Sequence, residues 1–166
     1  MEWLLAIKEE LTVFACSMLP ILELRFSIPL GEGLGLPIWL NYIISVVGNL
    51  LPIPFILIFI RKILEWMSVS RVALFRKAAD WILQRAEKHS ASVQKYATWG
   101  LFLFVAIPLP GTGGWTGALI AALLGMRFKK SMVSIVAGVM TAGILVSIVT
   151  LLVAAGINGF WNFFIS

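Results

Sequence analysis

The chain has 166 residues, of which 60% are hydrophobic and 13% charged, and its formal net charge is +5. A soluble domain of this length has too small an interior to hide so much apolar surface, so a mean hydropathy of +0.98 predicts an integral membrane protein. The single Cys and the single His exclude an internal disulfide and argue against a His or Cys metal site. Walker, Gly-x-Ser-x-Gly and His-based catalytic motifs are absent, so we expect no enzymatic activity, no metal and no cofactor.

The N-terminal region does not have the pattern of a cleavable signal peptide. It carries Glu2, Glu9 and Glu10 against Lys8, whereas a signal peptide begins with a basic stretch. Further along, residues 38–60 and 131–156 are two uninterrupted apolar stretches without Asp, Glu, Lys or Arg. Each exceeds the ~20 residues that a helix needs to cross a bilayer. Pro52 and Pro54 lie inside the first stretch and predict a kink there.

The two halves of the chain resemble each other at a displacement of 90 residues. The matched positions are Leu11, Phe14, Leu19 and Pro20 with Leu101, Phe104, Leu109 and Pro110, and Gly35, Val46 and Gly48 with Gly125, Val136 and Gly138. The match predicts a duplicated unit with an apolar run, a break rich in Pro and Gly, a short run, a Gly turn and a long apolar helix. We therefore expect one membrane domain, built from repeat 1 (1–60), a connector (61–97), repeat 2 (98–156) and a tail (157–166).

The basic residues predict how these units lie in the membrane. Eight of the thirteen lie between residues 61 and 95 and three more between 127 and 130. The positive-inside rule places both clusters in the cytoplasm only if residues 98–125 turn back inside the membrane. Residues 98–110 would reach only ~20 Å as helix, which is short of the ~30 Å core. The expected fold is thus an all-α inverted repeat, each copy a re-entrant hairpin plus a transmembrane helix, in the cytoplasmic (inner) membrane with the N-terminus outside.

The connector has the pattern of an amphipathic helix on the cytoplasmic surface. Its two faces are formed by Leu64, Met67, Phe75, Ala78 and Ile82 on one side and by Lys77, Asp80, Gln84 and Lys88 on the other. Trp66 and Trp81 suit the membrane interface. A role in anchoring and orientation is favoured over substrate binding, and the basic residues follow membrane flanks rather than forming a nucleic-acid groove.

The first break carries three charged residues, Glu23, Arg25 and Glu32. An ionisable side chain at membrane depth costs ~2.5–3.5 kcal/mol, so it normally faces a cavity or a partner. On a continuous helix Glu23 and Arg25 would point in nearly opposite directions. Either the backbone is non-helical there or each residue has its own partner. For Glu23 and Arg25, the alternative to a substrate or ion site is an ion pair that only fixes the hairpin tip. For Glu32, the alternative is a position at the membrane interface.

The second break is rich in glycine. Its candidate site residues are Pro110, Gly111, Thr112, Gly113, Gly114, Trp115 and Thr116. Glycines expose backbone N–H groups at the start of a half-helix, where the dipole favours an anion. The alternative is close helix packing through the Gly113 and Gly117 pair. Asn49, inside the first span, is a further candidate for the same cavity, unless it only bonds a neighbouring helix.

These motifs resemble those of the small multidrug export family. The residues that carry the likeness are Glu23-Leu24-Arg25, Ile28-Pro29-Leu30-Gly31 and Pro108-Leu109-Pro110-Gly111-Thr112-Gly113-Gly114-Trp115-Thr116-Gly117. More distantly the chain looks like the DedA-type proteins, whose membrane-embedded hairpins are linked to translocation of carrier-lipid phosphate. That resemblance implies an acidic residue in the first hairpin, which Glu23 matches. The arginine expected in the second hairpin is missing, and Arg25 stands in the first instead.

Together the two breaks predict a small, ion-coupled secondary transporter or flippase, and the resemblance implies an amphipathic, anionic lipid-phosphate or drug-like substrate. In this hypothesis Arg25 and the amides of residues 111–114 hold an anionic group while Glu23 takes up and releases a proton. A membrane scaffold with structural buried charges is the alternative, and an intramembrane enzyme using Glu23 and Glu32 comes third. Besides membrane lipids, the expected partner is a second copy, because two spans shield few polar groups; Ala121, Gly125 and Gly138 offer close-packing faces.

Overall fold

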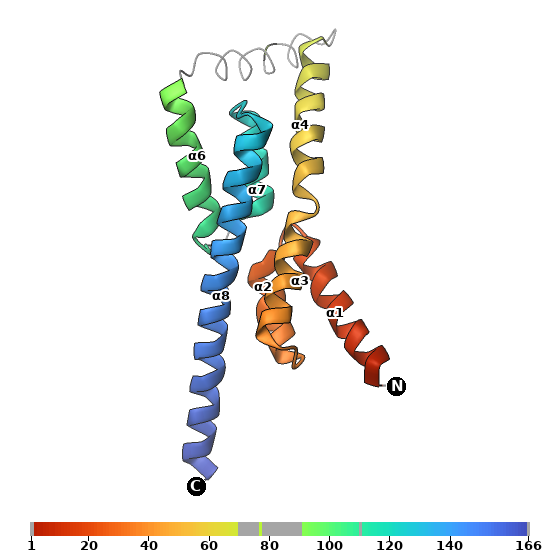
Figure 1. Ribbon diagram of the computed structural model, residues 1–166, viewed down its shortest axis with the longest axis vertical. Helices are drawn as coiled ribbons and strands as arrows, with labels where there is room; N and C mark the ends of the chain where they lie inside the picture. Colours follow the sequence, from red (N-terminus) through yellow and green to blue (C-terminus); the bar gives the residue numbers. More distant parts are fainter. Residues whose placement is uncertain (1, 70–76, 78–90, 110, 166) are drawn as a thin grey trace. The chain divides into compact units, whose positions relative to one another are not determined.

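A computed structural model describes residues 2–69, 77, 91–109 and 111–165 of the chain (Figure 1). Its helices are α1 (Glu2–Met18), α2 (Glu23–Gly33), α3 (Ile38–Leu50), α4 (Ile53–Ser68), α6 (Ala91–Ala106), α7 (Gly114–Leu123) and α8 (Phe128–Ile165). The described part of the chain contains no strand, so the all-α prediction is confirmed.

The chain forms two compact units. The first contains residues 1–49 and 140–166, and the second contains residues 50–139. The long helix α8 contributes its first turns to the second unit and the rest to the first. Each unit therefore combines one predicted hairpin with a helical segment from the other half of the chain. The boundaries after residues 49 and 139 are 90 residues apart, which equals the displacement found in the sequence.

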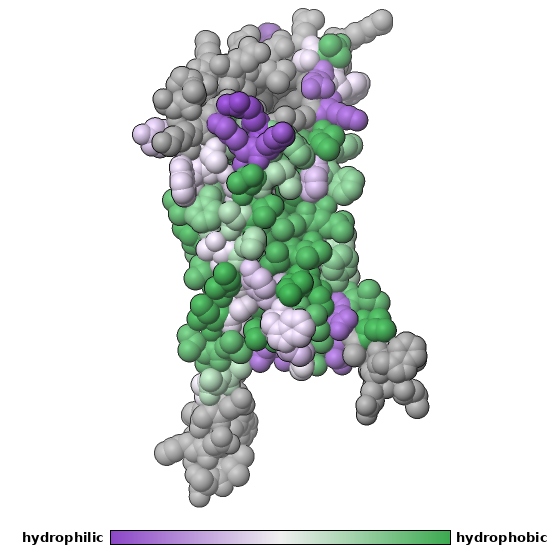
Figure 2. Space-filling model, in the orientation of Figure 1, coloured by the Kyte–Doolittle hydropathy of each residue, from purple (hydrophilic) through white to green (hydrophobic). Residues whose placement is uncertain are grey.

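Two helical stretches are long and apolar enough to cross a membrane. They are Ile38–Ser68, which is α3 followed by α4, and Phe128–Gly156 within α8. Only 33% and 28% of their most apolar windows are buried, and side chains such as Trp39, Phe55 and Leu152 are 64–68% exposed. Figure 2 shows a largely green, hydrophobic surface on the face in view. A surface of this kind needs lipid around it, and it supports the membrane prediction.

The first span is interrupted where the sequence predicts a kink. Helix α3 ends at Leu50, Leu51 and Pro52 form a turn, and α4 begins at Ile53 with Pro52 as its N-cap. Pro52 and Pro54 have no backbone N–H, so the carbonyl groups of Gly48 and Leu50 lose their usual helical donors. The predicted kink is confirmed.

The turn after α2 and the turn after α7 have the same hydrogen bonds. The first set is Leu34 N–H to Leu30 O, Gly35 N–H to Glu32 O and Leu36 N–H to Gly31 O, each 3.0 Å. The second set is Leu124 to Ile120 at 2.9 Å, Gly125 to Ala122 at 3.0 Å and Met126 to Ala121 at 3.0 Å. Gly35 and Gly125 have φ of +83° and +60°, which only glycine adopts readily. Each hydrogen bond of the first turn thus has a counterpart between residues 90 positions further along the chain.

The helices before the two breaks correspond at a different displacement. A Cβ on Gly48 would meet Ser17 Oγ and lie 2.9 Å from Phe14 O, whereas one on Gly138 would lie 2.7 Å from Val105 Cβ and 3.0 Å from Phe102 O. Phe102 and Val105 therefore occupy the places of Phe14 and Ser17, which are 88 residues earlier.

Helices α1 and α6 also end 88 residues apart, at Met18 and Ala106. The ungapped alignment is consequently wrong ahead of the breaks, where it paired Leu11 with Leu101 and Phe14 with Phe104. The connection after α6 has seven residues (107–113) against four after α1 (19–22), and two of the additional residues account for the change of displacement from 88 to 90. Apolar helices resemble each other at many displacements, so their sequences alone did not reveal this insertion.

The connector and the expected dimer faces are described in part. Helix α4 continues to Ser68, so the predicted connector begins inside it, while Phe75, Ala78, Ile82 and Trp81 lie outside the described residues. Ala121 and Gly138 are buried within the chain, so they are not faces available to a second copy as expected.

Candidate functional site

A tight turn places Glu23 at the start of α2. Helix α1 ends at Met18, and the Glu23 N–H donates to Leu19 O at 3.0 Å, which closes the turn. Glu23 has a φ of +48° and is the single described non-glycine residue in the left-handed region. This conformation costs roughly 1–2 kcal/mol in an L-residue, so the surrounding structure must hold Glu23 in place.

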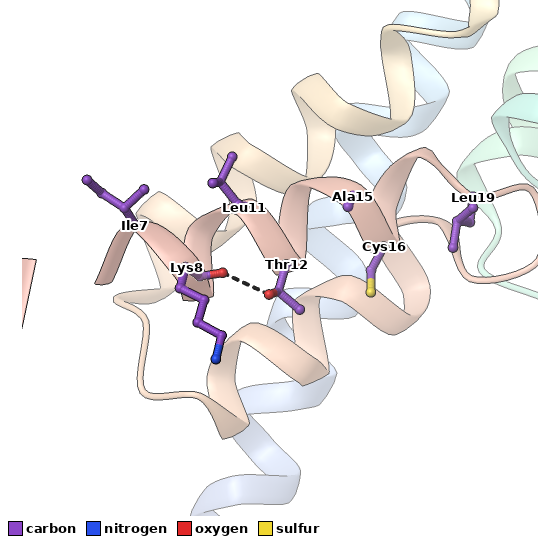
Figure 3. Close-up of a pocket in the computed structure, with 7 residues that line it drawn as sticks. All are labelled: Ile7, Lys8, Leu11, Thr12, Ala15, Cys16 and Leu19. Carbon is purple, nitrogen blue, oxygen red and sulfur yellow. Dashed lines mark hydrogen bonds between the residues drawn. The ribbon is translucent and has the colours of Figure 1, made fainter. Parts of the chain in front are cut away.

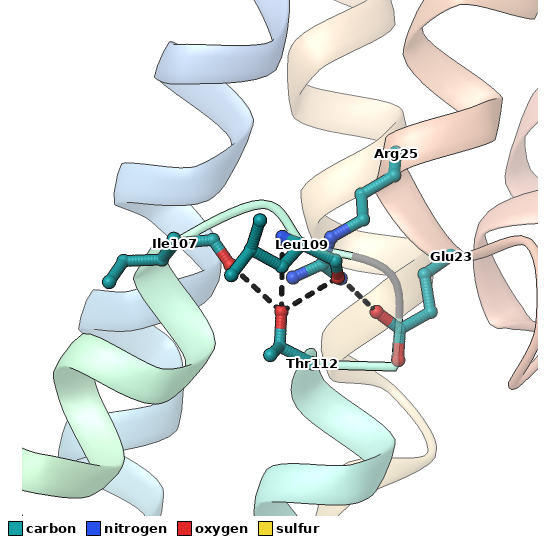
Figure 4. Close-up of polar contacts among 5 residues, drawn as sticks. All are labelled: Glu23, Arg25, Ile107, Leu109 and Thr112. Carbon is teal, nitrogen blue, oxygen red and sulfur yellow. Dashed lines mark hydrogen bonds and ion pairs between the residues drawn. The ribbon is translucent and has the colours of Figure 1, made fainter.

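Glu23 and Arg25 form an ion pair in this turn. The Arg25 Nη1 atom lies 2.6 Å from Glu23 Oε2 (Figure 4), and the two side chains are 19% and 5% exposed. Residues two apart on a regular helix cannot face each other. The positive φ of Glu23 removes this restriction, so the first of the two alternatives, a non-helical backbone, is correct.

Glu32 lies away from this pair. It is in the last turn of α2, nine residues or ~14 Å along the helix from Glu23, and its backbone carbonyl belongs to the Gly35 turn. Its side chain is half-buried. The structure therefore does not bring the two carboxylates together, which leaves the intramembrane enzyme without its acidic pair.

Thr112 organises the second break. Its Oγ1 lies 2.8 Å from both Ile107 O and Leu109 O, and it accepts a hydrogen bond from Leu109 N–H at 3.2 Å (Figure 4). The hydroxyl group thus cross-links the loop between α6 and α7 through hydrogen bonds to the loop's own backbone. Pro110, which was predicted as a site residue, lies outside the described residues.

The glycines of this loop have two different roles. Gly111 and Gly113 have φ of +82° and +147°, so the turn itself requires glycine at both positions. Gly113 and Gly114 are buried at the N-terminus of α7, which has no side-chain cap, while Trp115 and Thr116 are half-buried in its first turn. A Cβ on Gly117 would lie 2.6 Å from Val105 Cγ2, so this glycine permits close packing of α6 on α7 within the second hairpin, which differs from the predicted packing of one hairpin on the other.

A buried polar column that the sequence analysis did not predict lies between α2 and α3. Ser27 Oγ donates to Ser45 Oγ at 2.7 Å, Ser45 Oγ lies 3.4 Å from Asn41 Oδ1, and Asn41 Nδ2 donates to Ile28 O at 2.7 Å. Ser27, Asn41 and Ser45 are each 0% exposed. The four-residue spacing of Asn41, Ser45 and Asn49 within an apolar span was the signal that could have revealed the column.

Asn49 continues this face of α3. It is 0% exposed, and neither its Nδ2 nor its Oδ1 atom has a hydrogen-bond partner among the described residues. A buried amide in this state costs about 1–3 kcal/mol, and native proteins normally supply a partner. Asn49 was a candidate site residue, with a hydrogen bond to a neighbouring helix as the alternative. Among the described residues its amide makes no such bond.

A separate concave surface lies along α1. It has a volume of about 510 Å³ and is lined by Ile7, Lys8, Leu11, Thr12, Ala15, Cys16 and Leu19 (Figure 3). The Thr12 hydroxyl donates to Lys8 O at 2.8 Å, so its donor is used within the helix. The remaining surface is mostly apolar and suits an acyl chain better than a charged group.

The fold and these features define a class of protein: an all-helical membrane protein with a buried ion pair at a helix break. A model of the family described as putative small multi-drug export protein matches residues 23–145, a range that starts at Glu23 inside the first break and contains the second break. The chain belongs to this family, which agrees with the resemblance noted in its motifs. No curated protein and no solved structure matches the chain. Among the described residues, no three His, Cys, Asp or Glu side chains gather as a metal site would require.

Proposed function

We propose that the protein is a secondary transporter or flippase that moves an amphipathic, anionic lipid-phosphate or drug-like substrate with ion coupling. The Glu23–Arg25 pair is the main support for this proposal. It is an ion pair whose side chains are only 5% and 19% exposed, in a chain whose surface is mostly apolar. Replacing a buried ion pair by apolar residues is often neutral or stabilising, so stability alone does not explain why the pair is there. The family name points in the same direction.

The pair can switch between two states. When Glu23 is ionised it neutralises Arg25, and when Glu23 is protonated the guanidinium loses its counter-ion. An anionic headgroup can then bind Arg25 by charge-assisted hydrogen bonds. The N-terminus of α7, which has no side-chain cap, and the loop of Gly111 and Thr112 are a separate proposed anion contact within the second unit.

The repeated turns support an inverted-repeat arrangement for this transporter. Helices α1, α2, α6 and α7 have 17, 11, 16 and 10 residues, and each is shorter than the ~20 residues of a full span. We propose that they form two re-entrant hairpins of opposite orientation, with the N-terminus outside and the connector in the cytoplasm. Transporters of this kind bind substrate near the midplane, where the broken helices meet.

A flux assay tests the proposal. Purified protein is reconstituted in vesicles of phosphatidylethanolamine and phosphatidylglycerol, and the movement of a fluorescent anionic lipid or an organic-anion dye is followed with and without a pH gradient. We expect Glu23→Gln and Arg25→Ala to reduce the rate at least tenfold. The matched controls, Glu65→Gln and Lys62→Ala, change exposed side chains of α4 and should leave it unchanged.

The alternative is a membrane scaffold whose buried charges are structural. The hydrogen-bonded Thr112 loop and the close contact at Gly117 favour it, because both have packing roles already. In that case the wild-type protein shows no flux above empty vesicles, and the two variants only lower its thermal stability. A second copy is the expected partner in either case, and crosslinking in the same vesicles measures it.

A further inference from the structure

The polar column between α2 and α3 follows a regular antiparallel register. A Cβ on Gly31 would lie 2.6 Å from Asn41 Nδ2, so Gly31 faces Asn41. Four residues earlier on α2 and four later on α3, Ser27 is bonded to Ser45 at 2.7 Å. One further step of four residues along each helix places Glu23 opposite Asn49. By this register the backbone of Glu23 follows the buried face of α2 to the level of Asn49, whose two amide atoms have no hydrogen-bond partner among the described residues, while the φ of +48° turns the Glu23 side chain toward Arg25.

The other end of the column lies beneath the turn between α2 and α3. Asn41 is in the first turn of α3, and Gly33, Leu34, Gly35 and Pro37 in the preceding turn are exposed. From Asn41 to Asn49 is eight residues, or ~12 Å along the helix. The column therefore spans the distance between an exposed turn and the buried ion pair.

The second half of the chain lacks most of this column. At the positions 90 residues further on, Gly117 replaces Ser27, Ile135 replaces Ser45 and Val139 replaces Asn49. Asn41 alone has a polar counterpart, the buried Ser131, whose hydroxyl group donates to Arg127 O at the start of its own helix. The contact that replaces the hydroxyl pair is apolar, since a Cβ on Gly117 would lie 3.9 Å from Ile135 Cγ1. A structural requirement of the shared fold would affect both halves, so the polar column serves a purpose that only the first half has.

We infer that Asn49 binds a water molecule between the Ser27–Ser45 hydroxyl pair and Glu23, and that this column is the route by which Glu23 exchanges its proton with one side of the membrane. A buried amide with free donor and acceptor atoms matches a water molecule, which both donates and accepts. In the step itself an O–H bond of a hydronium ion at Asn49 breaks, an O–H bond forms on the Glu23 carboxylate, and neutral water remains. This inference rests on the proposed function, because it names the coupling ion of that site.

In the described residues of α1, α2, α3 and 140–156, few charged or titratable groups besides Arg25 accompany Glu23. Arg25 is its partner within α2, and α3 contributes only Tyr42, whose hydroxyl donates to Met140 O at 3.1 Å. Residues 140–156 of α8 contain no charged or titratable side chain. The nearest titratable group of α1 is Cys16, since the charged residues of that helix lie in its first half. The proposal therefore assigns proton exchange at Glu23 to the column rather than to a charged residue of α1, α3 or residues 140–156.

Infrared spectroscopy after a pH jump tests the inference without any substrate. The protein is held in lipid nanodiscs, and the carbonyl band of a protonated carboxyl group is assigned to Glu23 by its loss in Glu23→Gln. We expect the band to appear at least tenfold more slowly in Asn49→Val, which installs the residue found at position 139, and in Ser45→Ala. Ser134→Ala is the matched control in the second half, where the buried hydroxyl donates to Thr98 O at 3.0 Å, and it should not change the rate.

Two outcomes would overturn the inference. One is an unchanged rate in both Asn49→Val and Ser45→Ala while circular dichroism shows a folded protein. The other is a Glu23 band that does not respond to pH. Asn49→Leu adds a second reading, because a merely unsatisfied amide predicts higher thermal stability in this variant with an unchanged protonation rate. A normal proton exchange rate in a protein that moves no lipid or dye would instead contradict the proposed transport function alone.

Discussion

Arg25 Nη1 lies 2.6 Å from Glu23 Oε2 although the two residues are two apart in one helix. This contact exists because Glu23 has a φ of +48°, so the side chain leaves the helix in a direction that a regular first turn does not allow. The ion pair and the strained backbone are therefore one feature. Predictions about either must consider both.

Substitutions of Glu23 should distinguish the energetic cost of its strained backbone from the cost of losing its carboxylate. Glu23→Gly relieves the left-handed conformation but leaves Arg25 without this carboxylate, whereas Glu23→Ala also retains the strain. Removing one partner of a buried pair costs about 3–5 kcal/mol, and we expect Glu23→Ala to be about 1 kcal/mol less stable than Glu23→Gly. Thermal unfolding in one detergent measures both. Equal stabilities would show that the positive φ is not a source of strain.

The Ser27–Ser45 hydrogen bond should be measurable as a coupling energy. Both hydroxyl groups are fully buried, and their oxygen atoms are 2.7 Å apart. In a double-mutant cycle with Ser27→Ala and Ser45→Ala, we expect an interaction free energy of about 0.5–1.5 kcal/mol. The same cycle with Ser27→Ala and Ser134→Ala joins residues of the two separate units and should give additive effects. A coupling near zero in the first cycle would contradict the register of α2 and α3.

A methyl group at Gly48 should destabilise the first unit. The added Cβ would meet Ser17 Oγ and lie 2.9 Å from the backbone oxygen of Phe14, and the backbone cannot move aside cheaply. Gly48→Ala should therefore cost about 1–3 kcal/mol in chemical or thermal unfolding. Gly33→Ala is the control, because a Cβ there meets nothing within 4 Å, and helix propensity makes it neutral or stabilising by up to ~1 kcal/mol.

The Thr112 hydroxyl should matter for the loop between α6 and α7. It is the shared partner of Ile107 O, Leu109 O and Leu109 N–H. Thr112→Val retains the shape but removes these bonds, so we expect a loss of about 0.5–1.5 kcal/mol and faster proteolysis of the loop. Thr112→Ser keeps the hydroxyl group and should restore most of the stability. A valine variant as stable as the wild type would show that these hydrogen bonds do not hold the loop in place.

The sequence by itself determined the membrane setting, the two long apolar stretches, the kink at Pro52 and the identity of Glu23 and Arg25 as the exceptional residues. These follow from hydropathy and from the local chemistry of proline and charge, which act over a few neighbouring residues. The tertiary structure alone decided that Glu23 and Arg25 pair, that Ser27 meets Ser45, and that α1 and α6 correspond at 88 rather than 90 residues. Such contacts depend on a single backbone angle and on the rotation and register of packed helices. An apolar helix fits its neighbour at many registers, so its sequence leaves that choice to the whole fold.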